Sequence, residues 1–390
     1  MNLIFAKRME SLGTETAFEV LAKAKALERQ GKEIVHLEIG EPDFDTPKNI
    51  KEAAVKALYA GYTHYVPAAG IPELRETVAE HISKTRNIDV DSEEVVVTPG
   101  AKPIMFFSIL ALINPGDEVL NMNPGFPIYE SVINFVGAKQ VLIPLKEEND
   151  FRFDPEYVKE KITEKTRLIV LNSPENPTGG VLTRGDLKAV AECIADRNDV
   201  FVISDEVYSR ILYEGKHESI ASLPGMKEKT ILLDGFSKTY AMTGWRLGYG
   251  VMRKDLAQKV TQLMINSNSC TCAFVQKAGV EALKGPQDEP ARMVAEFKKR
   301  REVIVSGLNK IEGITCRKPR GAFYVFPNIT GTGMNCRELS DYLLNNAGVA
   351  VLSGTAFGQY GEGYLRLSFA NSVENIEKAL NRMAEALEKS

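Results

Sequence analysis

The alternation of two residue patterns along the chain constrains its fold more than any other feature. From about residue 91 onward, short runs rich in β-branched residues alternate with segments of helical period. This alternation is typical of parallel strands connected by crossover helices, so we expect an α/β fold. Seven strands are expected, enough for one large, mostly parallel sheet flanked by helices. They lie at residues 94–97, 118–122, 140–144, 167–171, 200–204, 230–233 and 247–251.

Two helices are predicted between these strands, at residues 101–113 and 183–197 with Thr183 as the N-cap of the second, and a third is predicted after the last strand, at 254–266. Beyond Pro286 the pattern changes to a long charged helix at 289–310, strands at 322–326, 349–352 and 364–369, and a closing helix after Ser372. We therefore expect a large domain at residues 46–285. A smaller α+β domain would combine residues 1–45, which include a helical stretch at 15–30, with residues 286–390.

Composition narrows the classes of partner. The 390 residues carry 48 Lys and Arg against 52 Asp and Glu, a net charge of -4, so no basic surplus favours nucleic acid. The longest apolar run is too short to span a bilayer, and no membrane association is expected. Five cysteines without C-x-x-C spacing indicate reduced thiols in the cytoplasm. With four histidines and no paired motif, no metal site is expected.

Several polar residues follow predicted strands directly. The first strand leads through Gly100, Ala101 and Lys102 into a helix, where unpaired backbone N–H groups could cradle a phosphate. An ordinary strand-to-helix turn would have the same sequence. Asp205 and Tyr208 follow the fifth strand, at the sheet edge where α/β proteins bind ligands. The alternative there is a helix cap beside a solvated glutamate.

The loop before the seventh strand, residues 236–249, places Lys238 and Arg246 among small, hydroxyl and aromatic residues. A lysine in such surroundings can lose its proton and attack an aldehyde. A surface loop with two solvated cations is the alternative.

Four segments together resemble a known family. The segment SKTYAMTGWRLGY at 237–249 resembles the cofactor-lysine motif of class I and II aminotransferases, pyridoxal-phosphate enzymes of fold type I. The segments IGEPDF at 39–44, NSPENPTG at 172–179 and YLRLSF at 364–369 extend the resemblance, in the expected order, over most of the chain. It is strongest to the subgroup that contains aspartate aminotransferases.

The resemblance implies roles for individual residues. Lys238 would hold pyridoxal 5′-phosphate as a Schiff base and then move the reacting proton. Asp205 would pair with the ring nitrogen, which makes the ring an electron sink. Tyr208 and Asn176 would bind the ring's 3′ oxygen. Phe126 would stack on the ring, where many relatives have tyrosine or tryptophan.

The resemblance also implies two anion sites. The cofactor phosphate would be bound by Gly100, Ala101, Lys102, Ser237 and Arg246, together with Tyr65 from a second subunit. The missing hydroxyl at Ala101 would leave more of this binding to the backbone and Arg246. The substrate α-carboxylate would be bound by Arg366 in a bidentate fork, by the amide of Gly40 and near Asn176. A homodimer with active sites at the subunit interface follows from the role of Tyr65.

The substrate stays open at this level. Lys102 is similar to a lysine that reaches the distal carboxylate of aspartate or glutamate in related enzymes, but it could equally contact only phosphate or solvent. We expect a ping-pong amino transfer between an L-amino acid and a 2-oxo acid, with aspartate and 2-oxoglutarate first. The alternatives are transfer from aromatic or neutral amino acids such as alanine or kynurenine, or carbon–sulfur lyase activity. A cofactor-sensing regulator would carry a DNA-binding domain in front of the aminotransferase-like part. Because the resemblance begins within the first few dozen residues, we disfavour this function.

Overall fold

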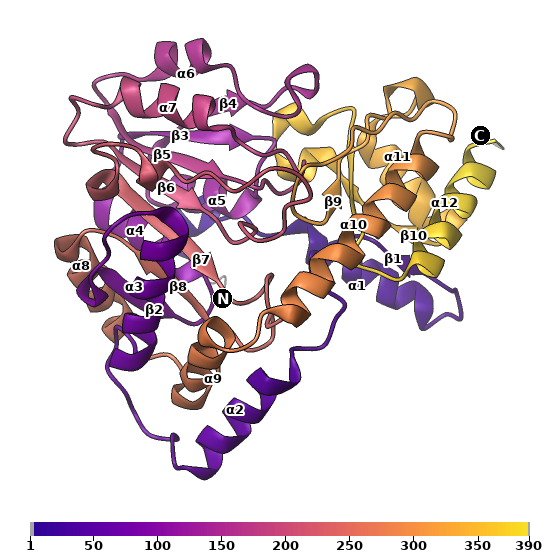
Figure 1. The fold of residues 1–390 in the computed structure, drawn as a ribbon. Helices are drawn as coiled ribbons and strands as arrows, with labels where there is room; N and C mark the ends of the chain where they lie inside the picture. Colours follow the sequence, from indigo (N-terminus) through magenta and orange to yellow (C-terminus); the bar gives the residue numbers. More distant parts are fainter. Residues whose placement is uncertain (1–3, 389–390) are drawn as a thin grey trace.

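A seven-stranded sheet forms the centre of the larger of two lobes in the computed structural model, which describes residues 4–388 (Figure 1). Its strand order is β2-β8-β7-β6-β5-β3-β4, and only β8 runs antiparallel to its neighbours. The strands are β2 (Val95–Thr98), β3 (Glu118–Asn123), β4 (Lys139–Pro144), β5 (Thr166–Asn172), β6 (Phe201–Asp205), β7 (Thr230–Gly235) and β8 (Gly248–Val251). The predicted α/β class and all seven predicted strands are confirmed, each boundary within two residues.

The central strands are apolar on both faces, because helices cover both. In β5, Leu168 and Val170 pack with α4 (Lys102–Leu112), α5 (Pro127–Phe135) and α8 (Lys254–Ser267). The alternate residues Ile169 and Leu171 pack on the opposite face with α6 (Pro155–Lys161) and α7 (Arg184–Cys193). The helices α2 (Lys48–Tyr59), α3 (Pro72–Arg86) and α9 (Ala273–Lys284) cover that same face near β2 and β8. Burial on both faces explains the continuous apolar runs.

The three helices predicted between and after the strands correspond to α4, α7 and α8. The side chain of Thr183 accepts a hydrogen bond from the Asp186 amide, which confirms the predicted N-cap of α7. This helix ends at Cys193, four residues before the predicted end, in a stretch where Asp196 and Asn198 favour turns over helix. The helices α2, α3, α5, α6 and α9 were not predicted.

The smaller lobe combines both ends of the chain. The N-terminal strand β1 (Val35–His36) pairs in parallel with β10 (Val349–Ala350), and Leu37 joins the same core as the C-terminal helices. Its other elements are α1 (Thr16–Glu28), α10 (Asp288–Leu308), β9 (Tyr324–Val325), α11 (Cys336–Tyr342), β11 (Leu352–Ser353), β12 (Leu365–Ser368) and α12 (Val373–Leu387). These contacts support the expected division of the chain, whose boundaries at residues 45 and 286 stay predictions.

One predicted strand is divided in the structure. Residues 349–352 were expected to form a single strand, but β10 pairs with β1 whereas β11 pairs with β12. The chain changes partner at Val351, so the apolar run serves two sheets. Within residues 4–388, no helix combines the length and apolar character needed to cross a membrane.

Candidate active site

A cavity of about 500 Å³ lies where the carboxyl ends of the sheet strands meet the smaller lobe. Asn172, Asp205 and Gly235, the last residues of β5, β6 and β7, line it from the large lobe, and Tyr324 and Arg366 line it from the small lobe. This is the sheet edge where α/β proteins bind ligands. The cavity also collects most of the predicted site residues: Gly40, Ala101, Lys102, Phe126, Asn176, Asp205, Tyr208, Ser237, Lys238, Arg246 and Arg366.

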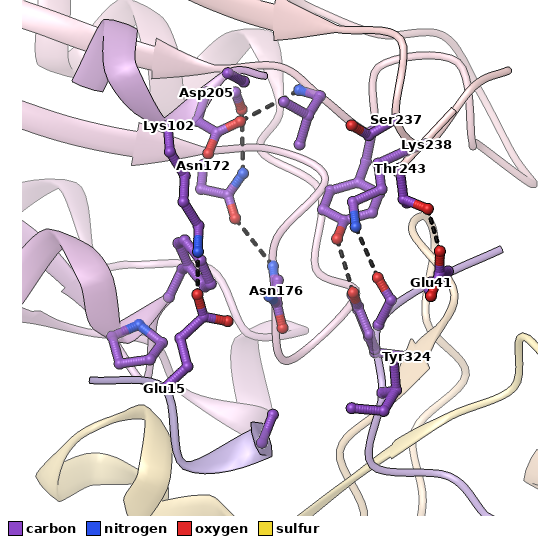
Figure 2. A pocket seen from close by; sticks show the side chains of 18 of the residues that line it. Glu15, Glu41, Lys102, Asn172, Asn176, Asp205, Ser237, Lys238, Thr243 and Tyr324 are labelled. Carbon is purple, nitrogen blue, oxygen red and sulfur yellow. Dashed lines mark hydrogen bonds and ion pairs between the residues drawn. The ribbon is translucent and has the colours of Figure 1, made fainter. Parts of the chain in front are cut away.

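Lys238 lies in the loop after β7 and points into this cavity (Figure 2). Its Nζ donates a hydrogen bond to the carbonyl oxygen of Gly40 at 2.7 Å and lies 5.8 Å from the ring centres of Tyr208 and Phe323. Burial lowers the pKa of Lys238 to about 8, against the attraction of Glu41. A substantial fraction of this amine is therefore neutral near physiological pH and can act as a nucleophile or base.

Asp205 ends β6 on the floor of the cavity. Its carboxylate accepts hydrogen bonds from the Tyr129 hydroxyl at 2.7 Å and the Val207 amide at 3.2 Å. Burial raises the pKa of Asp205 to about 6, although the Tyr129 bond opposes the rise. A buried carboxylate with so few donors favours a ligand that presents a cationic N–H group.

A buried ionic network lies behind Asp205. Arg86, the last residue of α3, places Nε 2.6 Å from Glu206 and Nη2 3.5 Å from Asp234. The His217 ring also contacts Glu206, at 2.8 Å. Although burial opposes ionisation, Arg86 and His217 hold the pKa of Glu206 well below its usual value. Burial raises the pKa of Asp234 to about 7, against the attraction of Arg86. The network joins α3 to the ends of β6 and β7.

A second polar corner is formed where β2 leads into α4. Gly100 has a φ of +84°, and a Cβ atom there would lie 2.2 Å from Nη2 of Arg246. The guanidinium thus packs directly over the glycine backbone, next to the first turn of α4, whose N–H groups have no partner within the helix. Ala101, Lys102 and Ser237 line the adjoining wall. Backbone donors, a helix N-terminus and an arginine together suit a phosphate.

Arg366, on β12, places a guanidinium in the opposite wall with only 3% of its surface exposed. It donates to the Glu38 carbonyl oxygen and, at 3.4 Å, to Oδ1 of Asn176, whereas its Nε has no hydrogen-bond partner. The rings of Tyr324 and Phe357 lie 4.7 and 5.1 Å from it. Since no carboxylate of residues 4–388 pairs with it, the site is suited to a ligand carboxylate.

Lys102 lines the cavity with about half of its side chain exposed. Its ammonium lies 5.3 Å from the ring centre of Phe126 and pairs with the carboxylate of Glu15, from the N-terminal segment (Figure 2). This pair lies within the chain itself, so the role of Lys102 toward a substrate carboxylate stays a prediction.

Several cavity residues were missed in the sequence. Tyr129 lies three residues after Phe126, on the same face of α5, so helical spacing could have indicated it. Tyr324, whose hydroxyl lies 2.7 Å from that of Tyr208, gave no local signal, and the pairing of Glu15 with Lys102 was not predicted. Gly100 does not line the cavity itself but packs against Arg246, which does. Tyr65 is 89% exposed and does not line the cavity of its own chain.

Comparison with known proteins gives consistent matches over nearly the whole chain. A model of the family described as aminotransferase class I and II matches residues 32–383. An aspartate aminotransferase of Pyrococcus horikoshii is 45% identical over 95% of this chain and 94% of its own. Aromatic-amino-acid aminotransferase 2 of Thermococcus litoralis is 42% identical over 91% and 92%. The crystal structure of an aspartate aminotransferase from Rhizobium meliloti superposes with a TM-score of 0.95 at 35% identity, covering 99% of both chains.

Proposed function

Because the chain belongs to the class I and II aminotransferase family, we propose that it moves the α-amino group of aspartate to 2-oxoglutarate in a ping-pong cycle. The observation that carries this proposal is one cavity that holds a buried lysine, Lys238, and a buried guanidinium, Arg366, which pairs with no carboxylate of residues 4–388. An amino acid needs both: a site for its carboxylate and a base beside its Cα.

Pyridoxal 5′-phosphate, which enzymes of this family use, fits the residues of the cavity. When bound, it supplies an aldehyde that condenses with amines and a ring that accepts electrons. We assign its phosphate to the corner of Gly100, Ala101, Lys102, Ser237 and Arg246, where a Cβ at Gly100 would collide with the guanidinium.

The remaining cofactor contacts use residues on the other walls. We assign the ring face to Phe126 and the ring nitrogen to Asp205, whose carboxylate has too few donors for its burial. Tyr208 and Asn176 would donate to the ring's 3′ oxygen, because both lie on the wall between Lys238 and Arg366.

The chain's own residues divide the chemistry between them. Arg366 orients the substrate by binding its α-carboxylate, and the amide of Gly40 holds the same group. Lys238 takes the proton from the substrate Cα on its Nζ and returns it, which a pKa of about 8 permits in both directions. Asp205 holds the proton of the ring nitrogen. Closely packed rings, among them Tyr324 and Phe357, limit access of water.

Aspartate is the preferred amino donor in this proposal because Lys102 offers a second cation. Its ammonium already meets a carboxylate, that of Glu15, inside the cavity. The distal carboxylate of aspartate or glutamate would bind in the same way. Aspartate aminotransferases among the relatives support this assignment.

A second candidate is transfer from aromatic or other neutral amino acids. The aromatic-amino-acid relative is almost as similar as the aspartate relative, at 42% against 45% identity. Ala17, Phe126, Leu352 and Phe357 also give the cavity an apolar side.

A half-reaction screen tests both candidates. The aldehyde form of the enzyme is mixed with each amino acid, and the spectral change to the amine form is followed. We expect the highest kcat/KM for aspartate and glutamate, and regeneration of the aldehyde form by 2-oxoglutarate. Release of ammonia and pyruvate without any 2-oxo acid would show a lyase instead.

We also propose that the enzyme is a homodimer of the cytoplasm. Several apolar side chains of and near α2 are exposed in the single chain: Val55, Leu58, Tyr59, Tyr62 and Tyr65. A second subunit would bury them and bring Tyr65 to the phosphate of its neighbour. Five unpaired cysteines agree with a reducing compartment.

A further inference from the structure

We propose that Glu15 determines substrate specificity by acting as an internal carboxylate that competes with the distal carboxylate of an acidic substrate for Lys102. This inference rests on the proposed function, since it concerns the substrate class of the same cavity. Glu15 lines the cavity from the N-terminal segment, directly before the first residue of α1 (Figure 2).

The Glu15 side chain is held inside the cavity rather than in solvent. Only 17% of it is exposed, against 47% of Lys102, and the two form an ion pair. The pair lies along the ring of Phe126, whose centre is 5.3 Å from the Lys102 ammonium. Within residues 4–388, the cations that line the cavity are Lys102, Lys238, Arg246 and Arg366. A carboxylate, that of Glu15, therefore already lies at Lys102.

The backbone next to Glu15 is attached to the large lobe. The Gly13 amide donates to the Ser131 hydroxyl at 2.9 Å, and that hydroxyl donates to the Gly13 carbonyl at 3.2 Å. The preceding 3₁₀ turn, Lys7–Ser11, packs against α5, which also carries Ser131. On the other side, α1 packs against β10 and β11 of the small lobe. Glu15 thus lies in a strap between two attachments, and its position over the cavity is built into the fold.

The two charges of the Glu15–Lys102 pair affect which substrates the cavity binds. While Glu15 is ionised and bound, the far end of the cavity carries one positive and one negative charge, so it attracts a second carboxylate less strongly than Lys102 alone would. A dicarboxylic substrate must displace Glu15 from Lys102, which opposes its binding. A neutral side chain leaves the pair intact and contacts Ala17, Phe126 and Phe357. One cavity can therefore accept both classes, and Glu15 reduces the preference for acidic substrates.

The test is equilibrium binding of two unreactive acids to the holoenzyme, measured by calorimetry. Succinate has both carboxylates of an acidic substrate, whereas butyrate has the same chain length and one carboxylate. In Glu15→Gln, which retains a hydrogen-bonding side chain, we expect the Kd of succinate to fall about five- to tenfold and that of butyrate to change less than twofold. Glu19→Gln removes the same charge from an exposed position on α1 and should change neither.

Two results would overturn the inference. An unchanged or higher Kd for succinate in Glu15→Gln would mean that Glu15 does not compete for Lys102. An equal change for both acids would mean that Glu15 only ties down the N-terminal segment. The ratio of the two Kd values is independent of turnover. If the wild-type holoenzyme aminated no 2-oxo acid, the proposed function would fail, while the ratio would still decide the role of Glu15.

Discussion

At the scale of single residues, burial shifts the pKa values of two ionisable groups in the cavity. The pKa of Lys238 falls to about 8 and that of Asp205 rises to about 6, and in both cases loss of water is the largest cause. Each group loses part of its preference for the charged form. The lysine can then exchange a proton near neutral pH, and the carboxylate gains most from a cationic partner.

The lowered pKa of Lys238 can be measured by labelling. In the apoenzyme, trace reductive methylation of its amine should rise with pH around a midpoint near 8, because only the neutral amine reacts. The exposed Lys298 of α10 is the reference amine in the same digest. Equal midpoints for the two lysines, read by peptide mass spectrometry, would contradict the effect of burial.

Tyr129 should act through Asp205. Its hydroxyl bond lowers the pKa of Asp205, so Tyr129→Phe should raise that pKa above about 6 and leave more of the carboxyl protonated at pH 7. We expect the Kd of pyridoxal phosphate to rise about tenfold, the value of one hydrogen bond to a charged group. Tyr157→Phe on α6, remote from the cavity, is the control. Equal affinities in both variants would remove Tyr129 from this role.

At the scale of elements, Arg86 joins α3 to the strand ends that carry Asp205 and Asp234. Arg86→Met would leave Glu206 and Asp234 buried without their cation, at a cost of about 3–5 kcal/mol. The urea midpoint of the apoenzyme should fall accordingly. Arg292→Met, which breaks an exposed pair with Glu289 on α10, should leave the urea midpoint nearly unchanged. Similar midpoints for the two variants would show that the network does not stabilise the sheet edge.

An element could be predicted from the sequence when the interactions that form it lie within the element itself. The strand β5 is apolar on both faces and bounded by polar residues, so its sequence alone indicates a buried strand. The N-caps Thr183 and Ser372 likewise act within their own helices. The division of residues 349–352 depends instead on β1 and β12, which come from opposite ends of the chain. No pattern inside the four residues contains that information.

At the scale of the whole molecule, the cavity is assembled from segments that lie far apart in sequence. Lys238, Asp205 and Arg366 were found because the family resemblance covers their motifs. Tyr324 and the pairing of Glu15 with Lys102 were not, because these contacts arise only where the strap and the small lobe meet the sheet edge. Glu15 and Lys102 are 87 residues apart, and each alone resembles an ordinary surface charge.

The subunit arrangement is tested by mass and by cofactor affinity together. Light scattering should give twice the chain mass of 43.1 kDa. Tyr65→Phe should then weaken pyridoxal-phosphate binding about tenfold, although the side chain is exposed in the single chain. Tyr59→Phe, on an equally exposed ring, is the control. A fully active monomer would contradict the shared active site.

The central claim is that the Lys238 amine reacts with the cofactor aldehyde beside Asp205. The most direct measurement is borohydride reduction of the holoenzyme followed by proteolysis and mass spectrometry of the modified peptide. We expect one modified residue per chain, Lys238, with no modification in Lys238→Ala. Modification of a different lysine, or of none, in an active wild-type enzyme would contradict the claim.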